Sequence, residues 1–444
     1  MKLPGRVNQC LIALIVAGSI VLVLVSSQIF KLITAEKDDP QVSWLIRLVN
    51  NFFGYLIIII PLYLVLRFVH NSGYLDAPGI GPLPRLIRRC FAEPPQLIEL
   101  LDTASVSIKN QSNASTTSKL VFCALGLLTS YLTWGFLQEK VMTKEYTSAD
   151  GEVGKFKDSQ FLVFVNRILA FCLAAVYLSV KRDHTSRSLP MYKYLLCSLS
   201  NILSSFCQYE ALKYVTFPLQ VLAKSCKVIP VMIMGKCVSS KKYENYEYIT
   251  AVMISIGMAA FLFGQEGSTA TKGKTVVETT LPGILLLVSY LMCDSFTSNW
   301  QGQLFSQYKV SSVQMMLGVN MFSCLLTTTS LLEQGAFPAA AAFMTKFPSF
   351  VTDCVILSIC SAVGQLFIFY TISQFGAVTF TIIMTIRQGL AILLSCIYYG
   401  HAVSIAGVLG ILMVFLAVFL RMYCAQRLKS IRQRRLAQSA NAAV

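Results

Sequence analysis

Predominantly apolar stretches, each long enough to cross a bilayer, recur along the whole chain and restrict its fold more than any other feature. A spanning helix needs about 18 or more such residues. Up to twelve segments qualify, near 10–30, 49–69, 119–138, 159–180, 190–208, 215–236, 248–265, 282–302, 311–332, 351–372, 377–400 and 403–421. Because lipid offers no hydrogen-bond partner, each must satisfy its own backbone as a helix. The sequence predicts an all-α polytopic membrane protein.

The charge distribution agrees with a membrane protein. Only 13% of the residues are charged and 55% are hydrophobic, whereas soluble domains carry about 25% charged residues. The net charge of +16 is concentrated in loops and in the C-terminal "RMYCAQRLKSIRQRRL". We interpret this excess as a positive-inside signal facing the anionic headgroups of the membrane lipids, and we predict no nucleic-acid partner.

The N-terminal part allows two interpretations. Its first apolar segment, "LIALIVAGSIVLVLVSSQIF", is either a cleaved signal peptide or a retained helix. The apolar core is long for a signal peptide and no clear small-x-small cleavage site follows, which favours the helix. We expect one or two N-terminal hydrophobic helices in 1–69 and a polar cytoplasmic linker over 70–118. The sequons at Asn110 and Asn113 would then never meet the glycosylation machinery.

Positive residues orient the chain. The basic tail, 425–444, should be cytoplasmic, and so should the loops that contain Lys181 and Lys236. Counting spans back from the tail places the 139–158 loop, with its mixed charges, on the opposite side. These assignments agree with one another.

A weak internal sequence repeat predicts two structural repeats. "VTF" occurs at 215–217 and again at 378–380, and a basic residue follows each by seven positions, Lys224 and Arg387. The same shift relates two five-span halves, which we place at 119–265 and 280–424. Because five is odd, the halves would have inverted topology, with a ligand site between them near the bilayer midplane.

Several charged residues lie deep inside the apolar segments. Lys224 and Lys227 lie about 12–16 Å inside their segment and, three residues apart, would share one helix face. Arg387 and Arg167 also lie within apolar runs, and Asp294 is the clear deep acid. A cation at the bilayer centre costs about 2.5–3.5 kcal/mol on insertion scales.

The excess of deep cations over acids has two explanations. In one, the cations form a structural network with Asp294 and with three glutamates at span ends, Glu139, Glu210 and Glu333. In the other, an anionic substrate supplies the missing charge. Unpaired buried charge is costly, so a structural network should balance more closely. We therefore favour the substrate site, with Asp294 as a supporting or gating charge.

Other polar residues accompany this predicted site. Pro230 removes an amide donor and predicts a kink beside the lysines. Gln208, Tyr209 and Glu210 precede the lysines; Tyr209 could stack on a base or simply pack. Asn299 lies in the polar run "DSFTSNWQGQ", which could bind a ribose or base edge or form a polar seam between helices.

No catalytic chemistry is indicated. The chain has no GxxxxGK[ST], HExxH or GxSxG motif, and its 14 cysteines show neither CxxC pairs nor metal-ligand spacing with its three histidines. We predict no catalytic residues, no metal and no cofactor, and thus not an enzyme.

Long blocks of the chain resemble the nucleotide-sugar transporter family of the drug/metabolite transporter superfamily. They are "SYLTWGFLQEKVMT", "DSQFLVFVNR", "LSNILSSFCQYEALKYVTFPLQVLAKSCKVIPVMIMGK", "DSFTSNWQ", "SSVQMMLGVNMFSCL" and "GQLFIFYTISQFGAVTFTIIMTIRQ". The resemblance covers about 119–424. It implies a core of ten helices in two inverted five-helix repeats.

Within the family the blocks are most similar to animal Golgi transporters of 3'-phosphoadenosine 5'-phosphosulfate (PAPS). This similarity implies import of PAPS from the cytosol into the Golgi lumen for sulfation, in exchange for adenosine 3',5'-bisphosphate or AMP. It also implies that Lys224, Lys227 and Arg387 face the substrate phosphates. The alternatives are another nucleotide anion, such as a UDP-sugar, and a non-transporting receptor or scaffold. Whether the chain forms a homo-oligomer is left open by the sequence.

Overall fold

The computed structural model describes most of the chain. The described residues are 5–34, 43–72, 87–88, 90–91, 113–143, 145–148, 151–154, 156, 159–181, 189–211, 214–215, 219–220, 223–224, 226–269, 281–308, 310–399 and 405–442. Most of the predicted linker, including the sequon at Asn110, lies outside them, as do the side chains of Asn113 and Glu139.

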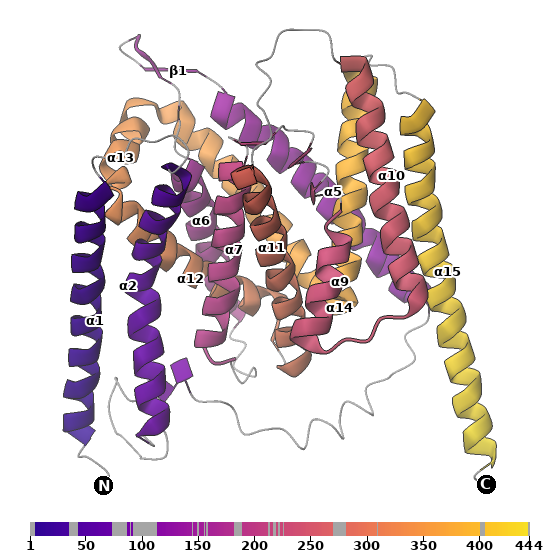
Figure 1. The fold of residues 1–444 in the computed structure, drawn as a ribbon, viewed down its shortest axis with the longest axis horizontal. Helices are drawn as coiled ribbons and strands as arrows, with labels where there is room; N and C mark the ends of the chain where they lie inside the picture. Colours follow the sequence, from indigo (N-terminus) through magenta and orange to yellow (C-terminus); the bar gives the residue numbers. More distant parts are fainter. Residues whose placement is uncertain are drawn as a thin grey trace. The chain divides into compact units, whose positions relative to one another are not determined.

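The described structure is almost entirely helical (Figure 1). Its long helices are α1 (Gly5–Thr34), α2 (Ser43–Asn71), α5 (Asn113–Thr143), α6 (Ser159–Lys181), α7 (Tyr192–Ala211), α9 (Val228–Ser239), α10 (Asn245–Thr269), α11 (Leu281–Gln307), α12 (Ser312–Glu333), α13 (Ala336–Lys346), α14 (Pro348–Tyr399) and α15 (Ile405–Ala442). A short antiparallel hairpin, β1 (Tyr146–Thr147) with β2 (Val153–Gly154), joins α5 to α6. The predicted fold class, all-α and polytopic, is confirmed.

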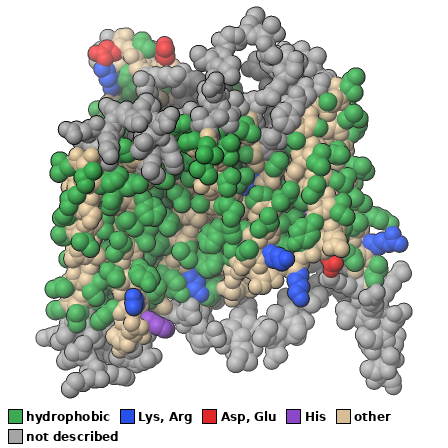
Figure 2. All heavy atoms as spheres, viewed as in Figure 1, with side chains coloured by type: hydrophobic (Ala, Val, Ile, Leu, Met, Phe, Trp, Pro, Cys, Tyr) green, Lys and Arg blue, Asp and Glu red, His purple; other side chains and the backbone are tan. Residues whose placement is uncertain are grey.

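Within the described parts of the chain, eight helical segments are long and apolar enough to cross a membrane. Many of their large hydrophobic side chains point outward, for example Leu14, Phe136 and Leu412. Figure 2 shows such side chains over much of the described surface on the face drawn. An exposed apolar belt of this kind is what a lipid-facing surface requires.

The predicted span at 215–236 is wrong as a continuous helix. α7 ends at Ala211, and α9 begins only at Val228, so that Pro230 stands in its first turn. Of the residues described between them, 219–220 and 223–224 are helical, and Cys226 and Lys227 form a turn directly before α9. Proline has no amide proton and fits the first helical turn, but farther inside a helix it would leave a carbonyl unbonded. The amide of Ile229 instead bonds the carbonyl of Cys226 at 3.4 Å. The expected kink is therefore a break.

α14 contains two predicted spans, 351–372 and 377–400, which meet at a second break. Gly376 has φ 82° and ψ 169°, a conformation that residues with a side chain rarely adopt. The predicted boundary between the two spans thus coincides with a glycine that the backbone requires. The sequence did not predict α13 or the β-hairpin.

Two compact units make up the chain. The first contains Met1–Ile202 and Leu304–Ser373, and the second contains Leu203–Gln303 and Gln374–Val444. Each unit therefore takes helices from both predicted repeats. In the first, α6 packs on α12, and in the second, α10 packs on α15. By their order in the two predicted halves, α6 and α12 are each the second span and α10 and α15 each the fifth, so counterparts pack on each other. The repeat boundaries themselves stay a prediction.

The α10–α15 contact depends on two glycines. A Cβ added to Gly410 would lie 2.4 Å from the carbonyl oxygen of Gly257, and one added to Gly257 would lie 2.7 Å from that of Gly410. Small residues of this kind let membrane helices approach closely enough for their backbones to touch.

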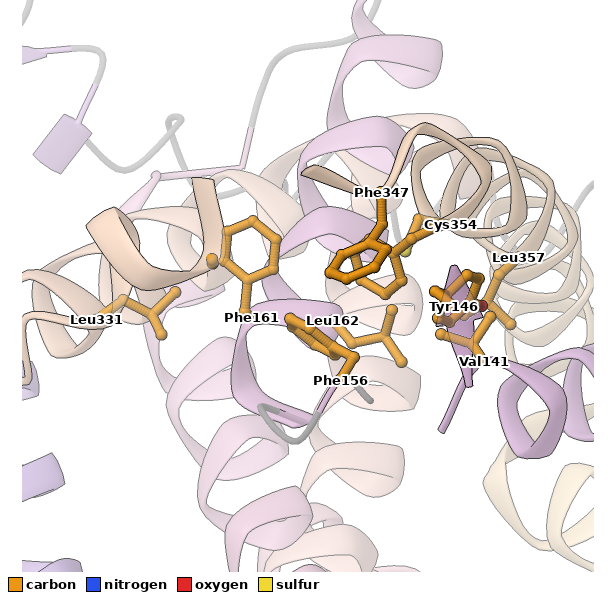
Figure 3. Close-up of a cluster of buried hydrophobic side chains, with 11 residues drawn as sticks. Val141, Tyr146, Phe156, Phe161, Leu162, Leu331, Phe347, Cys354 and Leu357 are labelled. Atoms are coloured by element: carbon orange, nitrogen blue, oxygen red, sulfur yellow. The ribbon is translucent and has the colours of Figure 1, made fainter. Parts of the chain in front are cut away.

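The first unit has a dense aromatic core, shown in Figure 3. The rings of Phe156 and Phe350 are tilted against each other with centroids 4.5 Å apart, and Tyr146 of the hairpin contacts the Phe350 ring edge-on at 5.4 Å. The Tyr146 hydroxyl donates to Asp353 (3.2 Å), and Lys140 pairs with the same carboxylate (3.1 Å). Burial, together with Asp353, raises the pKa of Tyr146. The hairpin is thereby fixed to the helix ends.

The N-terminal helices belong to this first unit. α1 packs on α2, and α2 packs on α12. Lys31 pairs with Glu333 at 2.7 Å, and the buried side chain of Asn51 accepts a hydrogen bond from Ser330 at 2.8 Å. Glu333, a predicted partner of the deep cations, is thus bound to a lysine of α1.

Candidate functional site

The break before α9 creates the centre of the candidate site. Lys227 is the N-cap residue of α9, and its carbonyl oxygen accepts a helical hydrogen bond from the amide of Val231 at 3.1 Å. Twelve helical residues separate it from the end of α9 at Ser239, which places it about 18 Å from that end. Lys224 lies before the break. The prediction that the two lysines share the face of one helix is therefore wrong, although both do lie deep in the segment.

Lys227 forms an ion pair with Asp294 of α11. Its ammonium group also lies 5.8 Å from the centroid of the Phe380 ring, which follows the break of α14. The two charged side chains are 12% and 25% exposed, so the pair is largely but not completely shielded. Three separate elements, the start of α9, the middle of α11 and the second part of α14, thus meet at one ammonium group.

Lys224 brings a further cation and Arg387 another. The charges that act on Lys224 are those of Arg387, Asp294 and Lys227. We call these four residues the charge cluster. They comprise three cations and one carboxylate.

The structure adds two residues that sequence reasoning missed. Tyr290 is buried on α11, on the same helix face as Asp294. Phe380 faces Lys227. Both signals were available: Tyr290 precedes Asp294 by four positions, one helical turn, and Phe380 precedes Arg387 by seven, two turns.

Asn299 and Pro230 have structural positions beside the cluster. Asn299 is 0% exposed, and its Nδ2 donates to the carbonyl oxygens of Val231 (2.8 Å) and Ser295 (3.0 Å). It ties α11 to α9, as the polar-seam interpretation predicted for this run. Pro230 lies in the first turn of α9.

Of the predicted residues at the end of α7, Gln208 takes part through its backbone carbonyl. Gln220, 1% exposed, donates from Nε2 to the carbonyl of Gln208 at 2.8 Å and so fastens the broken segment to α7. Glu210 is buried in the last turn of α7. The side chain of Tyr209 lies outside the described residues.

Arg167 belongs to the first unit. It lies on α6, within electrostatic range of Cys324 on α12. The second unit therefore assembles three of the four predicted cations, and Arg167 is not among them.

Membrane-spanning helices that are broken beside a buried, unbalanced group of charges are typical of a transporter that carries an anionic solute. The comparison with known proteins agrees. Residues 119–425 match the model of the UAA transporter family, so the chain belongs to that family. It is a transporter and not an enzyme, and the predicted family is confirmed.

Relatives in several organisms resemble the chain over most of its length. It is 48% identical over 418 residues to adenosine 3'-phospho 5'-phosphosulfate transporter 1 of Drosophila melanogaster, covering 92% of this chain and 89% of that protein. Identity to the Homo sapiens protein of the same name is 50% over 394 residues, covering 87% and 88%. UDP-galactose/UDP-glucose transporter 5B of Arabidopsis thaliana is 39% identical over 300 residues, covering 67% and 86%.

Proposed function

We propose that this protein imports PAPS from the cytosol into the Golgi lumen, in exchange for adenosine 3',5'-bisphosphate or AMP. The names of its relatives support the substrate, since proteins named for PAPS are about half identical to this chain across most of its length. The relative named for UDP-sugars is more distant and matches less of the chain.

The observation that carries the proposal is the gathering of Lys224, Lys227 and Arg387 in the second unit, beside the break before α9. Charged side chains inside membrane-spanning segments are expensive and mark substrate sites. PAPS has a 3'-phosphate, a 5'-phosphate and a sulfate, and so brings several negative charges. Such a ligand would match these three cations.

Individual roles follow from the chemistry of each side chain. Arg387 can bind a phosphate or sulfate through two parallel hydrogen bonds, whereas Lys224 and Lys227 act as point charges. The start of α9 adds the positive end of a helix dipole at the same place. Gln208 and Tyr209 are proposed as adenosine contacts, and Arg167 as a supporting charge.

Transport would proceed by alternating access, with the two predicted repeats moving about the site. Exchange follows because the empty, positively charged cluster crosses the barrier poorly. The proposed orientation puts the C-terminal tail in the cytosol, facing Golgi membrane lipids. The lumenal side would then include the β-hairpin, β1–β2.

The test is uptake of labelled PAPS into liposomes that contain the purified protein and are preloaded with AMP or adenosine 3',5'-bisphosphate. UDP-sugars and inorganic sulfate serve as competitors. Saturable uptake that requires preloading and resists UDP-sugars is expected. Uptake of a UDP-sugar without uptake of PAPS would retain the site and overturn the substrate.

A further inference from the structure

We propose that Asp294 is an internal counter-anion, which the substrate displaces from Lys227 on binding and which recaptures Lys227 when the substrate leaves. This inference rests on the proposed function, since it needs an anionic substrate at the charge cluster. It assigns to Asp294 the task of keeping affinity low enough for turnover.

The carboxylate of Asp294 is paired with the ammonium group of Lys227, the N-cap residue of α9. A phosphate that approaches the start of α9 would require the same ammonium group. The partial exposure of both side chains means that the pair is accessible rather than sealed in the packing. A substrate phosphate and Asp294 would therefore compete for one cation.

The packing of α11 on α9 does not depend on this ion pair. Asn299, on the same helix as Asp294, already donates to the carbonyl of Val231 on α9 at 2.8 Å, and it is completely buried. This neutral bond joins the two helices without a charge. A carboxylate that served only to hold α11 in place would duplicate it, at a greater desolvation penalty.

A displaced carboxylate would also find a new hydrogen-bond partner. Tyr290 is buried one turn before Asp294 on α11, so the two side chains lie on the same face of the helix. Its hydroxyl group is a hydrogen-bond donor that could receive the carboxylate after it leaves Lys227. Asp294 also acts on Lys224 from its present position, so its charge weakens the attraction of the whole cluster for an anion.

In transport, the carboxylate of Asp294 would lower the affinity for the substrate and speed the release of the substrate. Removing the carboxylate charge leaves three cations for the substrate and removes the competitor. Binding would become tighter, but the substrate would leave more slowly, because nothing replaces it at Lys227 on release. A single change would thus lower KM and the maximal rate together, which simple damage to the fold does not do.

The test compares purified Asp294→Asn with the wild-type protein in liposomes, using binding of labelled adenosine 3',5'-bisphosphate and its exchange for PAPS. We expect at least about fivefold tighter binding, given the strength of a charge interaction at contact distance, with a lower maximal rate. Asp294→Glu, which keeps the charge, should return both values toward wild type. The matched control is Asp353→Asn, which removes an ion-paired aspartate of the first unit and should leave affinity unchanged.

The outcomes separate the two proposals. Unchanged or weaker binding by Asp294→Asn, while the wild type binds well, overturns the role of Asp294 and leaves the proposed function intact. If the wild type itself binds no adenine nucleotide, the proposed function fails instead. Should Asp294→Asn not fold, infrared difference spectra of the wild type provide the test. Addition of adenosine 3',5'-bisphosphate must shift a carboxylate band, and no shift would contradict the displacement.

Discussion

The two units treat charge within the membrane-spanning helices in different ways. In the first unit, two ion pairs lie at helix ends: Lys31 with Glu333 at 2.7 Å, and Lys140 with Asp353 at 3.1 Å. The second unit has a pair as well, Arg421 with Glu247 at 3.0 Å, but it also gathers three cations and the carboxylate of Asp294 beside the break before α9. Pairs near the ends cost little because they remain close to water. A group of cations deep in the segment is expensive, and its persistence points to a ligand.

The two units also differ in the regularity of their backbone. The first unit has an aromatic core in which the rings of Phe156, Phe343 and Phe350 contact one another. The second unit interrupts its helices where the charges gather, at the start of α9 and, eleven residues before Arg387, at Gly376. Irregular backbone at membrane depth is tolerated where it is buried or lines a cavity, and this is where transporters bind their solutes.

The largest effect should come from removing a cation of the second unit. Lys227→Ala or Arg387→Ala should reduce PAPS exchange at least about a hundredfold, because each loses a charge-assisted contact worth several kcal/mol in a shielded site. The measurement is uptake into liposomes at matched protein amounts. Lys140→Ala, which removes a paired lysine of the first unit, is the control and should retain substantial exchange. Full transport by Lys227→Ala would refute the assignment.

A smaller effect, on folding, is expected at the contact between α10 and α15. Gly410→Ala puts a methyl group within 2.4 Å of a backbone oxygen, and such overpacking costs about 1–3 kcal/mol. The amount of folded protein in detergent, followed by size-exclusion chromatography, should fall. Gly18→Ala on α1 has no atom within 4 Å of the new methyl group and should behave as wild type. Equal behaviour of the two variants would mean that the α10–α15 contact is looser than described.

Loss of a balanced pair should affect stability rather than transport affinity. Asp353→Asn weakens the link between Asp353, Lys140 and the Tyr146 hydroxyl. The lysine is 41% exposed, so we expect a loss of about 1 kcal/mol in the free energy of unfolding. Thermal denaturation should show a slightly lower Tm, with an unchanged KM for PAPS. A changed KM would break the distinction between the two units.

The smallest effect is expected at Phe380. Replacing its ring by leucine removes the cation–π contact with Lys227, which at 5.8 Å lies near the distance limit of such contacts, so we expect a loss of about 0.5–1 kcal/mol. KM for PAPS should change by about two- to fivefold. Phe380→Tyr keeps an aromatic face and should stay near wild type. Identical KM values in the leucine and wild-type proteins would show that the ring only packs.

Much of this architecture could be predicted from the sequence. Apolar length and the charge pattern located most of the spans, because lipid leaves a helix as the only solution for each of them. The deep lysines and Arg387 stood out for the same reason, as charges in a place where charge is expensive. Repeated spacing also linked Lys224 with Arg387 before either was placed in space.

Other features depend on contacts that linear spacing does not encode. The break before α9 was expected only as a kink, because the effect of Pro230 depends on whether a helix turn precedes it. The pairing of Lys227 with Asp294 joins residues far apart in the chain. Glu333, which the sequence offered as a span-end partner for the deep cations, is bound by Lys31 in the first unit. Only the fold decides which acid meets which base.

One measurement tests most directly whether the unbalanced cluster is the ligand site. Adenosine 3',5'-bisphosphate should raise the Tm of the purified wild-type protein, since a ligand at 100 times its Kd adds about 2.7 kcal/mol of stability. The same rise is expected for Lys140→Ala, altered in the first unit, and no rise for Lys227→Ala. Equal stabilisation of all three proteins would contradict the account, because the nucleotide would then bind without the charge cluster.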